Sequence, residues 1–291
     1  MAGIATLADL VFGNTLLMDT IAKHLRQPAL VQLCQVHKLG RQTVTPLLLR
    51  SPQLRTHKQV QAFSRYVGIP IPYVTSMIQC YGDLVQALDL SEIWIQSLAM
   101  TYDILSLIFM YCRRVKVLSL KRCHKISGND FRYLFLAGRE LCWSLISLNV
   151  TGMHSIIPHL KVVFRQLPNI KTLILNRTNI NDAVIIIISQ HMPSLELLEI
   201  VKCSQVTDVG IQALASGCPK LAYLQTRRCK RIHNVSLLQQ ISARGGKEVD
   251  YDDSGSYEEY YGYYNHENDY DSGDYGNYSD GGCSDLWWLQ L

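Results

Sequence analysis

Residues 195–203 read LELLEIVKC and residues 221–229 read LAYLQTRRC, so that one frame is written twice, 26 residues apart. Its first and fourth residues are leucines, its sixth is isoleucine or threonine, and a cysteine closes it. Between the two copies, Ile211, Leu214 and Ala215 have the i, i+3, i+4 spacing of one helix face. The stretch therefore predicts a strand, a turn and a helix that recur together.

The frame can be followed backwards through four more copies. The six copies begin at residues 85, 115, 145, 170, 195 and 221, which are 30, 30, 25, 25 and 26 residues apart. A strand and a helix that recur at roughly this period are typical of leucine-rich repeats. The sequence therefore predicts an α/β solenoid of about six β-turn-α leucine-rich repeats over residues 84–246.

The rest of the chain divides by composition. Residues 1–50 indicate a helical unit, and residues 51–83 a linker with a helix from Lys58 to Val67. Residues 1–246 carry 27 Lys/Arg and 12 Asp/Glu, a charge of +15, whereas residues 247–291 carry 1 and 12, a charge of −11. The latter segment contains nine tyrosines and no aliphatic residue between Val249 and Leu286. It is therefore expected to be a disordered acidic tail.

Six of the nine cysteines occupy only two positions of the repeat. They either precede a frame by three residues or close one: Cys112, Cys142, Cys218, Cys123, Cys203 and Cys229. Equivalent positions explain this spacing without disulfide bonds, because cysteine acts there as a small apolar residue with a weak S–H donor. Free buried thiols indicate a reducing compartment, so we expect a cytoplasmic or nuclear protein. The sequence predicts neither a membrane span nor a signal peptide.

No motif for catalysis is found. A glycine-rich phosphate loop, G-x-S-x-G and H-E-x-x-H are all missing from the sequence. Cys123–His124 with Cys229 and His233 come nearest to a metal site, but the repeat turns account for both thiols. We therefore expect a protein that is not an enzyme and has no metal or cofactor.

A row of cations is predicted beside the strands. Seven residues after each frame begins, the chain has Glu92, Arg122, Gly152, Arg177, Lys202 and Arg228. The preceding position adds two more cations, so that the basic row comprises Lys121, Arg122, Arg177, Lys202, Arg227 and Arg228. Stacked strands place equivalent positions side by side, and guanidinium groups bind carboxylates and phosphates bidentately. The row therefore predicts an acidic or phosphorylated ligand, the alternative being ordinary solvent-exposed Lys and Arg.

The N-terminal segment has two apolar groups. They consist of Leu17, Ile21 and Leu25 on one helix face, and of Leu30, Leu33 and Val36 after Pro28. One interpretation is a helical cap that closes the open end of the repeats, as solenoids require.

The pattern Leu17-x-x-x-Ile21-x-x-x-Leu25, then Leu30-x-x-Leu33-Cys34-x-Val36-His37-Lys38, resembles the middle of an F-box, although the usual opening Leu-Pro is absent. An F-box before cysteine-containing repeats is similar to the layout of the F-box/leucine-rich-repeat family. In that family the F-box binds a SKP-type adaptor of an SCF-type cullin–RING ubiquitin ligase, and the repeats hold the substrate. The resemblance therefore implies that the adaptor, and through it a cullin, is bound by Leu17, Ile21, Leu25, Leu30, Leu33 and Val36.

These observations favour a substrate-recognition subunit that holds an acidic or phosphorylated protein on its sheet face. Two alternatives stay open: a repeat scaffold or regulator outside any ligase, and a nucleic-acid-binding solenoid. The last is disfavoured because few aromatic residues accompany the basic row and the acidic tail would compete. The tail either folds back on the row, with Trp287 and Trp288 as a latch, or serves only to keep the chain soluble.

Overall fold

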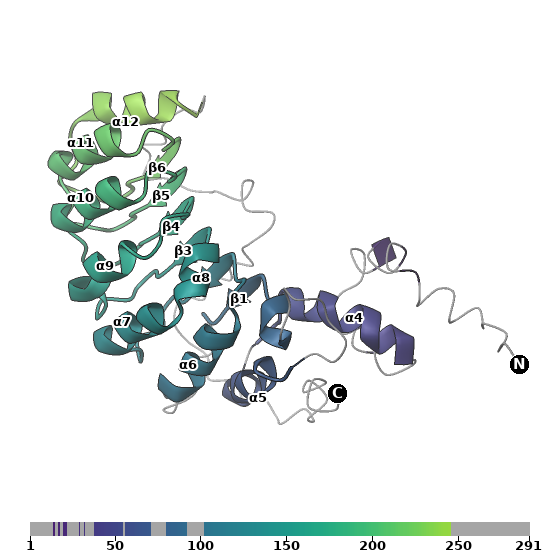
Figure 1. Ribbon diagram of the computed structural model, residues 1–291. Coiled ribbons are helices and arrows are strands. Elements are labelled where there is room, and N and C mark those ends of the chain that lie inside the picture. The colour runs from purple at the N-terminus through teal and green to yellow at the C-terminus, as the bar shows by residue number, and fades with distance from the viewer. Residues whose placement is uncertain are drawn as a thin grey trace, which may run out of the picture.

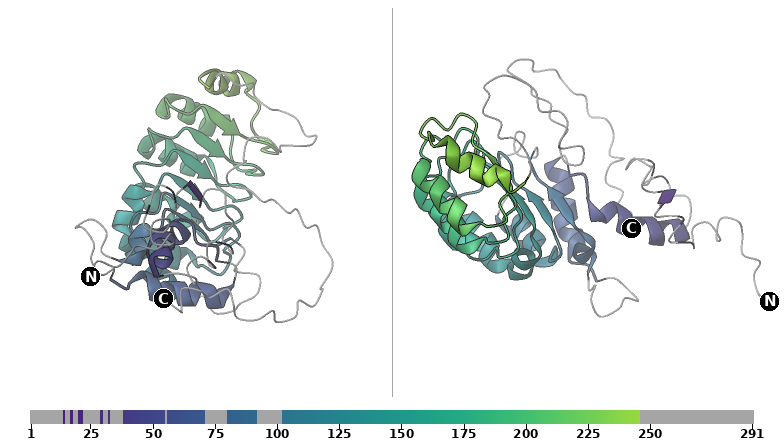
Figure 2. Two further views of the ribbon diagram at one scale, coloured as in Figure 1. Left: turned by 90° about the vertical axis from the view of Figure 1, so that its right-hand side faces the viewer. Right: turned by 90° about the horizontal axis from the view of Figure 1, so that it is seen from above.

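The computed structural model describes residues 38–54, 56–70, 80–91 and 102–245, together with residues 14, 17, 20, 21, 29 and 32. In these ranges the chain forms an open, curved stack of repeats (Figure 1). Short strands line the inner side of the curve and helices line the outer side (Figure 2). The architecture is therefore the solenoid that the repeated frame predicts.

One parallel sheet runs the length of the stack. It comprises β1 (Ala87–Asp89), β2 (Val117–Ser119), β3 (Ser147–Asn149), β4 (Thr172–Ile174), β5 (Leu197–Glu199) and β6 (Tyr223–Gln225), in chain order. The fourth residue of each frame pairs with its counterpart in the next, from Leu88 with Leu118 to Leu198 with Leu224. This register confirms all six frames, including the first.

Seven helices of the described residues cover the outer side. They are α6 (Tyr102–Tyr111), α7 (Gly128–Ala137), α8 (Arg139–Ser144), α9 (Ile157–Phe164), α10 (Asp182–His191), α11 (Asp208–Gly217) and α12 (Val235–Ala243). The second repeat holds both α7 and α8, which accounts for its longer period. Frame leucines and helix residues such as Ile211 and Leu214 form one continuous core. Each repeat therefore depends on its neighbours to bury its apolar surface.

Polar residues fix the helix starts where the sequence indicates. The hydroxyl of Ser127 accepts the N–H of Asp130 at 3.1 Å ahead of α7, and the hydroxyl of Thr207 accepts the N–H of Val209 at 3.2 Å in α11. Each bond satisfies a donor that the first helical turn leaves without an intrahelical partner. Both helices therefore begin at a residue whose side chain caps them.

Two aspartates then link neighbouring repeats. The carboxylate of Asp182 accepts both the backbone N–H of Thr207 at 2.8 Å and its hydroxyl at 2.7 Å. One repeat later, Asp208 accepts the N–H groups of His233 and Asn234, each at 2.9 Å. These carboxylates therefore orient the start of the next helix.

The repeat cysteines are buried and free. The thiol of Cys203 donates to the carbonyl oxygen of Leu175 at 3.3 Å, and that of Cys229 to the carbonyl oxygen of Ile200 at 2.9 Å. Both acceptors belong to the preceding repeat. The role predicted for these residues, a small buried group with an S–H donor, is confirmed.

Burial raises the pKa of Cys142 to about 12, and raises the pKa values of Cys218 and Cys229 to about 11. In the unfolded chain a thiol ionises near pH 9, so between pH 9 and 11 the unfolded state holds fewer protons than the folded state. We therefore expect the free energy of unfolding to fall as the pH rises through this window. Urea titrations at pH 8, 9 and 10 measure it.

The same burial predicts that thiol reagents leave the seven described cysteines unmodified at pH 8 until the chain unfolds. Peptide mapping after a short pulse of reagent, with and without urea, separates them from Cys34 and Cys283, which lie outside the described residues. Rapid modification of Cys203 in the folded protein would contradict this prediction.

Between residues 38 and 91, the described chain also forms α4 (Lys38–Arg50), α5 (His57–Val67) and the 3-10 helix η1 (Tyr81–Leu84) ahead of or beside the first strand. The helix predicted from Lys58 to Val67 is confirmed by α5, and a capping box between Thr56 and Gln59 opens it. No helix of the described residues is long and apolar enough to cross a membrane.

The helix α4 packs on the first repeat, and Pro46 lies inside this helix. Val44, Leu48 and Leu49 are buried in the same core as the repeats. The carbonyl oxygen of Arg50 accepts the N–H of Gln86 at 2.9 Å. Residues 44–50 are therefore continuous with the first repeat, because their apolar face is needed to cover its open end.

The structure describes two of the six predicted adaptor-binding residues. Leu17 is helical and 40% exposed, and Ile21 is half-buried against the core. Leu25, Leu30, Leu33 and Val36 lie outside the described residues, as do Glu92 and the tail.

Candidate functional site

The basic row stands on a turn that follows the strands. After β2, the N–H of Cys123 donates to the carbonyl oxygen of Leu120 at 3.1 Å, which closes a four-residue turn. The third residue of this turn, Arg122, has φ of 59°. Positive φ recurs at the equivalent residues: Gly152 (76°), Arg177 (53°), Lys202 (60°) and Arg228 (61°). A bonded four-residue turn with positive φ at its third residue has type II geometry, which favours glycine there.

Four of these five turns carry a cation in spite of that preference. A left-handed conformation costs an L-residue roughly 1–2 kcal/mol, a cost that glycine does not have. The backbone alone would therefore select glycine, as it does at Gly152. Side chains kept at unfavourable φ values gather at functional sites. The geometry of the turn therefore does not by itself account for the cation at these four positions.

Hydrogen bonds between repeats align the turns. The N–H of Arg122 donates to the carbonyl oxygen of Thr151 at 2.8 Å, and that of Lys202 to the carbonyl oxygen of Arg227 at 2.9 Å. These backbone N–H groups are already engaged in hydrogen bonds within the fold, so a ligand would contact the side chains instead. Arg122, Arg177, Lys202 and Arg228 are exposed, whereas Lys121 and Arg227 are half-buried beside them. At about 4.8 Å per strand, the last three turns form a continuous strip of charge.

The charges of this strip act on one another. The pKa of Lys202 is lowered, most strongly by the charge of Arg177, then by loss of hydration, and then by the charges of Arg228 and Arg227. Like charges lower the pKa of a lysine because they disfavour its protonated form. An anionic ligand that lies along Arg177, Lys202 and Arg228 would relieve this repulsion.

The second repeat extends the row across the glycine turn. A Cβ atom placed on Gly152 would lie 3.6 Å from Cγ of Arg122 and 3.6 Å from Cε1 of His124. Both side chains therefore lie next to the position that the side chain of a larger residue would occupy. The structure thus brings all six predicted cations to the same end of the strands.

One neighbouring acidic residue was not singled out from the sequence. Glu199 on β5 is buried, and its carboxylate accepts the side-chain amide of Asn176 at 2.7 Å. Asn176 in turn accepts the N–H of Val201 at 2.7 Å. This chain of bonds fixes the backbone that precedes Arg177. The sequence did contain a sign of this contact. Glu199 stands four residues after its frame begins, Asn176 stands six residues after the previous frame begins, and both are polar.

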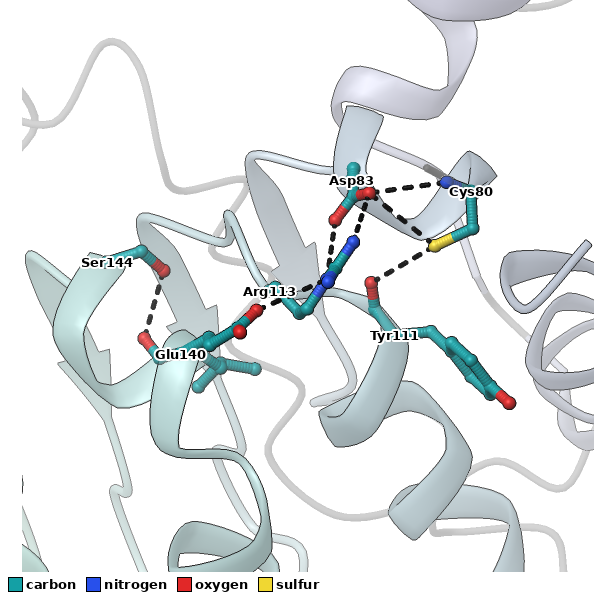
Figure 3. A network of polar contacts seen from close by, with 7 residues as sticks. Cys80, Asp83, Tyr111, Arg113, Glu140 and Ser144 are labelled. Atoms are coloured by element: carbon teal, nitrogen blue, oxygen red, sulfur yellow. Dashed lines mark hydrogen bonds and ion pairs between the residues drawn. The ribbon is translucent and has the colours of Figure 1, made fainter. Parts of the chain in front are cut away.

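A second polar cluster lies at the opposite end of the strands (Figure 3). The guanidinium of Arg113 donates from Nε to Oδ1 of Asp83 at 2.9 Å and from Nη2 to Oδ2 at 2.6 Å. Glu140 approaches Arg113 at 3.3 Å, and the N–H of Cys80 donates to Asp83 at 3.3 Å. This ion pair ties η1 to the turn before β2, so its contribution is structural.

An open hollow of about 840 Å³ borders this cluster. It is lined by Asp83, Arg113, Arg114, Arg139, Glu140, Trp143 and Ser144. Nothing among the described residues indicates catalysis there, because its buried carboxylate is engaged by a guanidinium. No group of three or more His, Cys, Asp or Glu in the described part of the chain could hold a metal. Cys123 and Cys229, on the second and sixth repeats, are not brought together.

No family model matches the sequence. Two curated proteins are similar over part of it. The antagonist of mitotic exit network protein 1 of Saccharomyces cerevisiae is 30% identical over 148 residues, 48% of this chain and 26% of that protein. F-box protein SKIP19 of Arabidopsis thaliana is 29% identical over 163 residues, 54% of this chain and 51% of that protein. The chain thus spans between a quarter and about half of the length of these relatives.

Among solved structures, the crystal structure of the yeast Rad7 and Elc1 complex contains a similar chain. The TM-score is 0.36 and the sequence identity 14%, over 84% of this chain and 79% of that chain. In its described residues the protein is an α/β solenoid with one six-stranded parallel sheet, and its sequence is similar to that of an F-box protein.

Proposed function

We propose that the chain is a substrate-recognition subunit of an SCF-type cullin–RING ubiquitin ligase. Its N-terminal apolar residues would bind a SKP-type adaptor, and its basic row would hold an acidic or phosphorylated segment of the substrate. The chain would perform no chemistry itself, and ubiquitin transfer would belong to other subunits. The free buried thiols suit a cytoplasmic or nuclear site of action.

The proposed substrate-binding role is supported chiefly by the set of cations at positive φ. Arg122, Arg177, Lys202 and Arg228 keep their charge where the turn favours glycine. Arginine and lysine on a rigid, repeated backbone present their charges at a fixed spacing. An extended peptide advances about 3.3 Å per residue, so three of its residues, about 9.9 Å, cover two turn spacings, about 9.6 Å.

The adaptor half is supported by the similarity to an F-box protein and by the N-terminal apolar pattern. The structure refines how it should be tested. Deletion of residues 1–50 would remove Val44, Leu48 and Leu49 from the core, and would damage the repeats as well as any adaptor site. Point substitutions before residue 38 avoid this.

The double variant Leu17→Asp/Leu25→Asp is therefore expected to abolish co-purification of the SKP-type adaptor and cullin with the tagged full chain. Burying a carboxylate in an apolar contact costs several kcal/mol, enough to remove micromolar binding. The matched control is Leu136→Asp, an exposed leucine on α7. Thermal melts of all three proteins verify the fold. Unchanged adaptor recovery with the double variant would contradict the F-box assignment.

A second candidate is a regulator that acts outside any ligase by binding its target. The similarity to the antagonist of mitotic exit network protein 1 favours it. The same purification separates the two proposals. A regulator would retain its target, and lose it when the basic row is neutralised, without recovering adaptor or cullin.

A further inference from the structure

The structure presents a row of cations at one end of the sheet, and the sequence ends in a segment of opposite charge. Residues 247–291 carry a charge of −11, against +15 in residues 1–246. In the last three repeats, Arg177, Arg227 and Arg228 already lower the pKa of Lys202 by their repulsion. A polyanionic segment of the same chain can bind these cations without the loss of translational freedom that a separate ligand incurs.

We infer that the acidic segment 247–291 occupies the basic row of its own chain and competes there with acidic ligands. The inference rests on the ligand-binding role proposed for the row, and adds its regulation. It does not depend on whether the chain joins a ligase.

The place where the described chain ends supports this occupant. Arg244 donates from Nη1 to the carbonyl oxygen of Cys218 at 2.9 Å, and from Nη2 to that of Ala215 at 2.7 Å. A Cβ atom on Gly245 would lie 3.0 Å from Cβ of Ala222, the residue before β6. The described chain therefore ends beside the residue that precedes β6, and the row stands at the far end of that strand.

The distances fit the length of the segment. From Ala222 to Arg228 is six residues, or roughly 20 Å of extended chain. The row from Arg122 to Arg228 covers four strand spacings, or roughly 19 Å. Lys247 to Asp285 is 39 residues, and a flexible coil of that length would have a root-mean-square span of roughly 35 Å. The segment is thus long enough to reach the row and lie along it.

Tethering makes even weak binding effective. A flexible linker gives an effective concentration in the millimolar range. If the free segment bound with a Kd of roughly 0.1 mM, the tethered segment would weaken a competing ligand about tenfold. Both contacts are between exposed charges, so the competition should disappear as salt rises above roughly 0.3 M.

The test measures the affinity of the full chain for a fluorescent oligoglutamate peptide at low salt. In the tail-neutral variant, every Asp and Glu of residues 247–291 is replaced by Asn or Gln. It should bind the peptide about tenfold more tightly than the original chain. A variant with the same tail residues in shuffled order is the matched control, and should behave as the original. Equal affinity of the original and tail-neutral chains would overturn the inference.

A second readout locates the contact directly. A carbodiimide that joins touching carboxylates and amines should link the tail to Lys202, and far less to Lys161 on α9, which is also exposed but lies on the helical side. Links found only in a dimer band would place the tail on a second molecule and contradict an intramolecular contact. If neither chain binds the peptide at all, the ligand role of the row is wrong, whereas adaptor binding remains a separate question.

Discussion

Replacement of Arg177, Lys202 and Arg228 together by glycine is expected to weaken binding of an acidic peptide about 10- to 100-fold while the fold stays intact. Three exposed charge contacts contribute roughly 0.5–1 kcal/mol each, and 1.4 kcal/mol is tenfold in affinity. Glycine is the residue that positive φ favours, and these residues have φ of 53°, 60° and 61°. Relief of that conformation offsets the greater freedom of glycine in the unfolded chain.

The expected change in the free energy of unfolding is therefore within about 1 kcal/mol, measured by urea titration. A matched control removes the same charge elsewhere, through Arg114→Gln, Arg139→Gln and Lys161→Gln, at exposed positions outside the row. That triple variant should keep most of the affinity. If both variants lost it equally, net charge and not the row would bind the peptide.

The second large effect concerns the ion pair in Figure 3. Arg113→Met should lower the free energy of unfolding by about 3–5 kcal/mol, because it leaves a buried carboxylate without its guanidinium. The side chain of Asp83 is 1% exposed and that of Arg113 is 26% exposed. Urea titration measures the loss.

The neighbouring residue supplies the control, since Arg114 is exposed and Arg114→Met should change stability by about 0.5 kcal/mol or less. The double variant Asp83→Asn/Arg113→Met should recover part of the loss, since the buried group is then neutral. A single Arg113→Met variant as stable as the original chain would show that the pair contributes nothing.

The sequence was sufficient to predict the sheet because the period of the repeat determines which residues pair in neighbouring strands. Residues at equal positions in successive frames are neighbours in space, and the six frames therefore predict five strand pairings. The same rule explains contacts that were not predicted. Asp83 and Arg113 each stand two residues before a frame, and Lys171 and Glu196, 2.8 Å apart, each stand one residue after its first position.

Two features were beyond the periodic pattern. The positive φ of the basic row depends on the turn type, for which a single glycine in the column, Gly152, was the only sign. The packing of α4 on the first repeat depends on which surface its apolar face covers, and amphipathicity alone does not specify that. The structure aligns the six cations of the basic row as predicted: Lys121, Arg122, Arg177, Lys202, Arg227 and Arg228. Their role in binding stays a prediction.

The most direct test of the proposed function is reconstitution from purified proteins. The full chain is mixed with a SKP-type adaptor, and the molar mass of the eluting species is measured by light scattering after size-exclusion chromatography. The account predicts a complex of one chain with one adaptor, which the Leu17→Asp/Leu25→Asp variant does not form. Separate elution of the two unmodified proteins at micromolar concentration would contradict it.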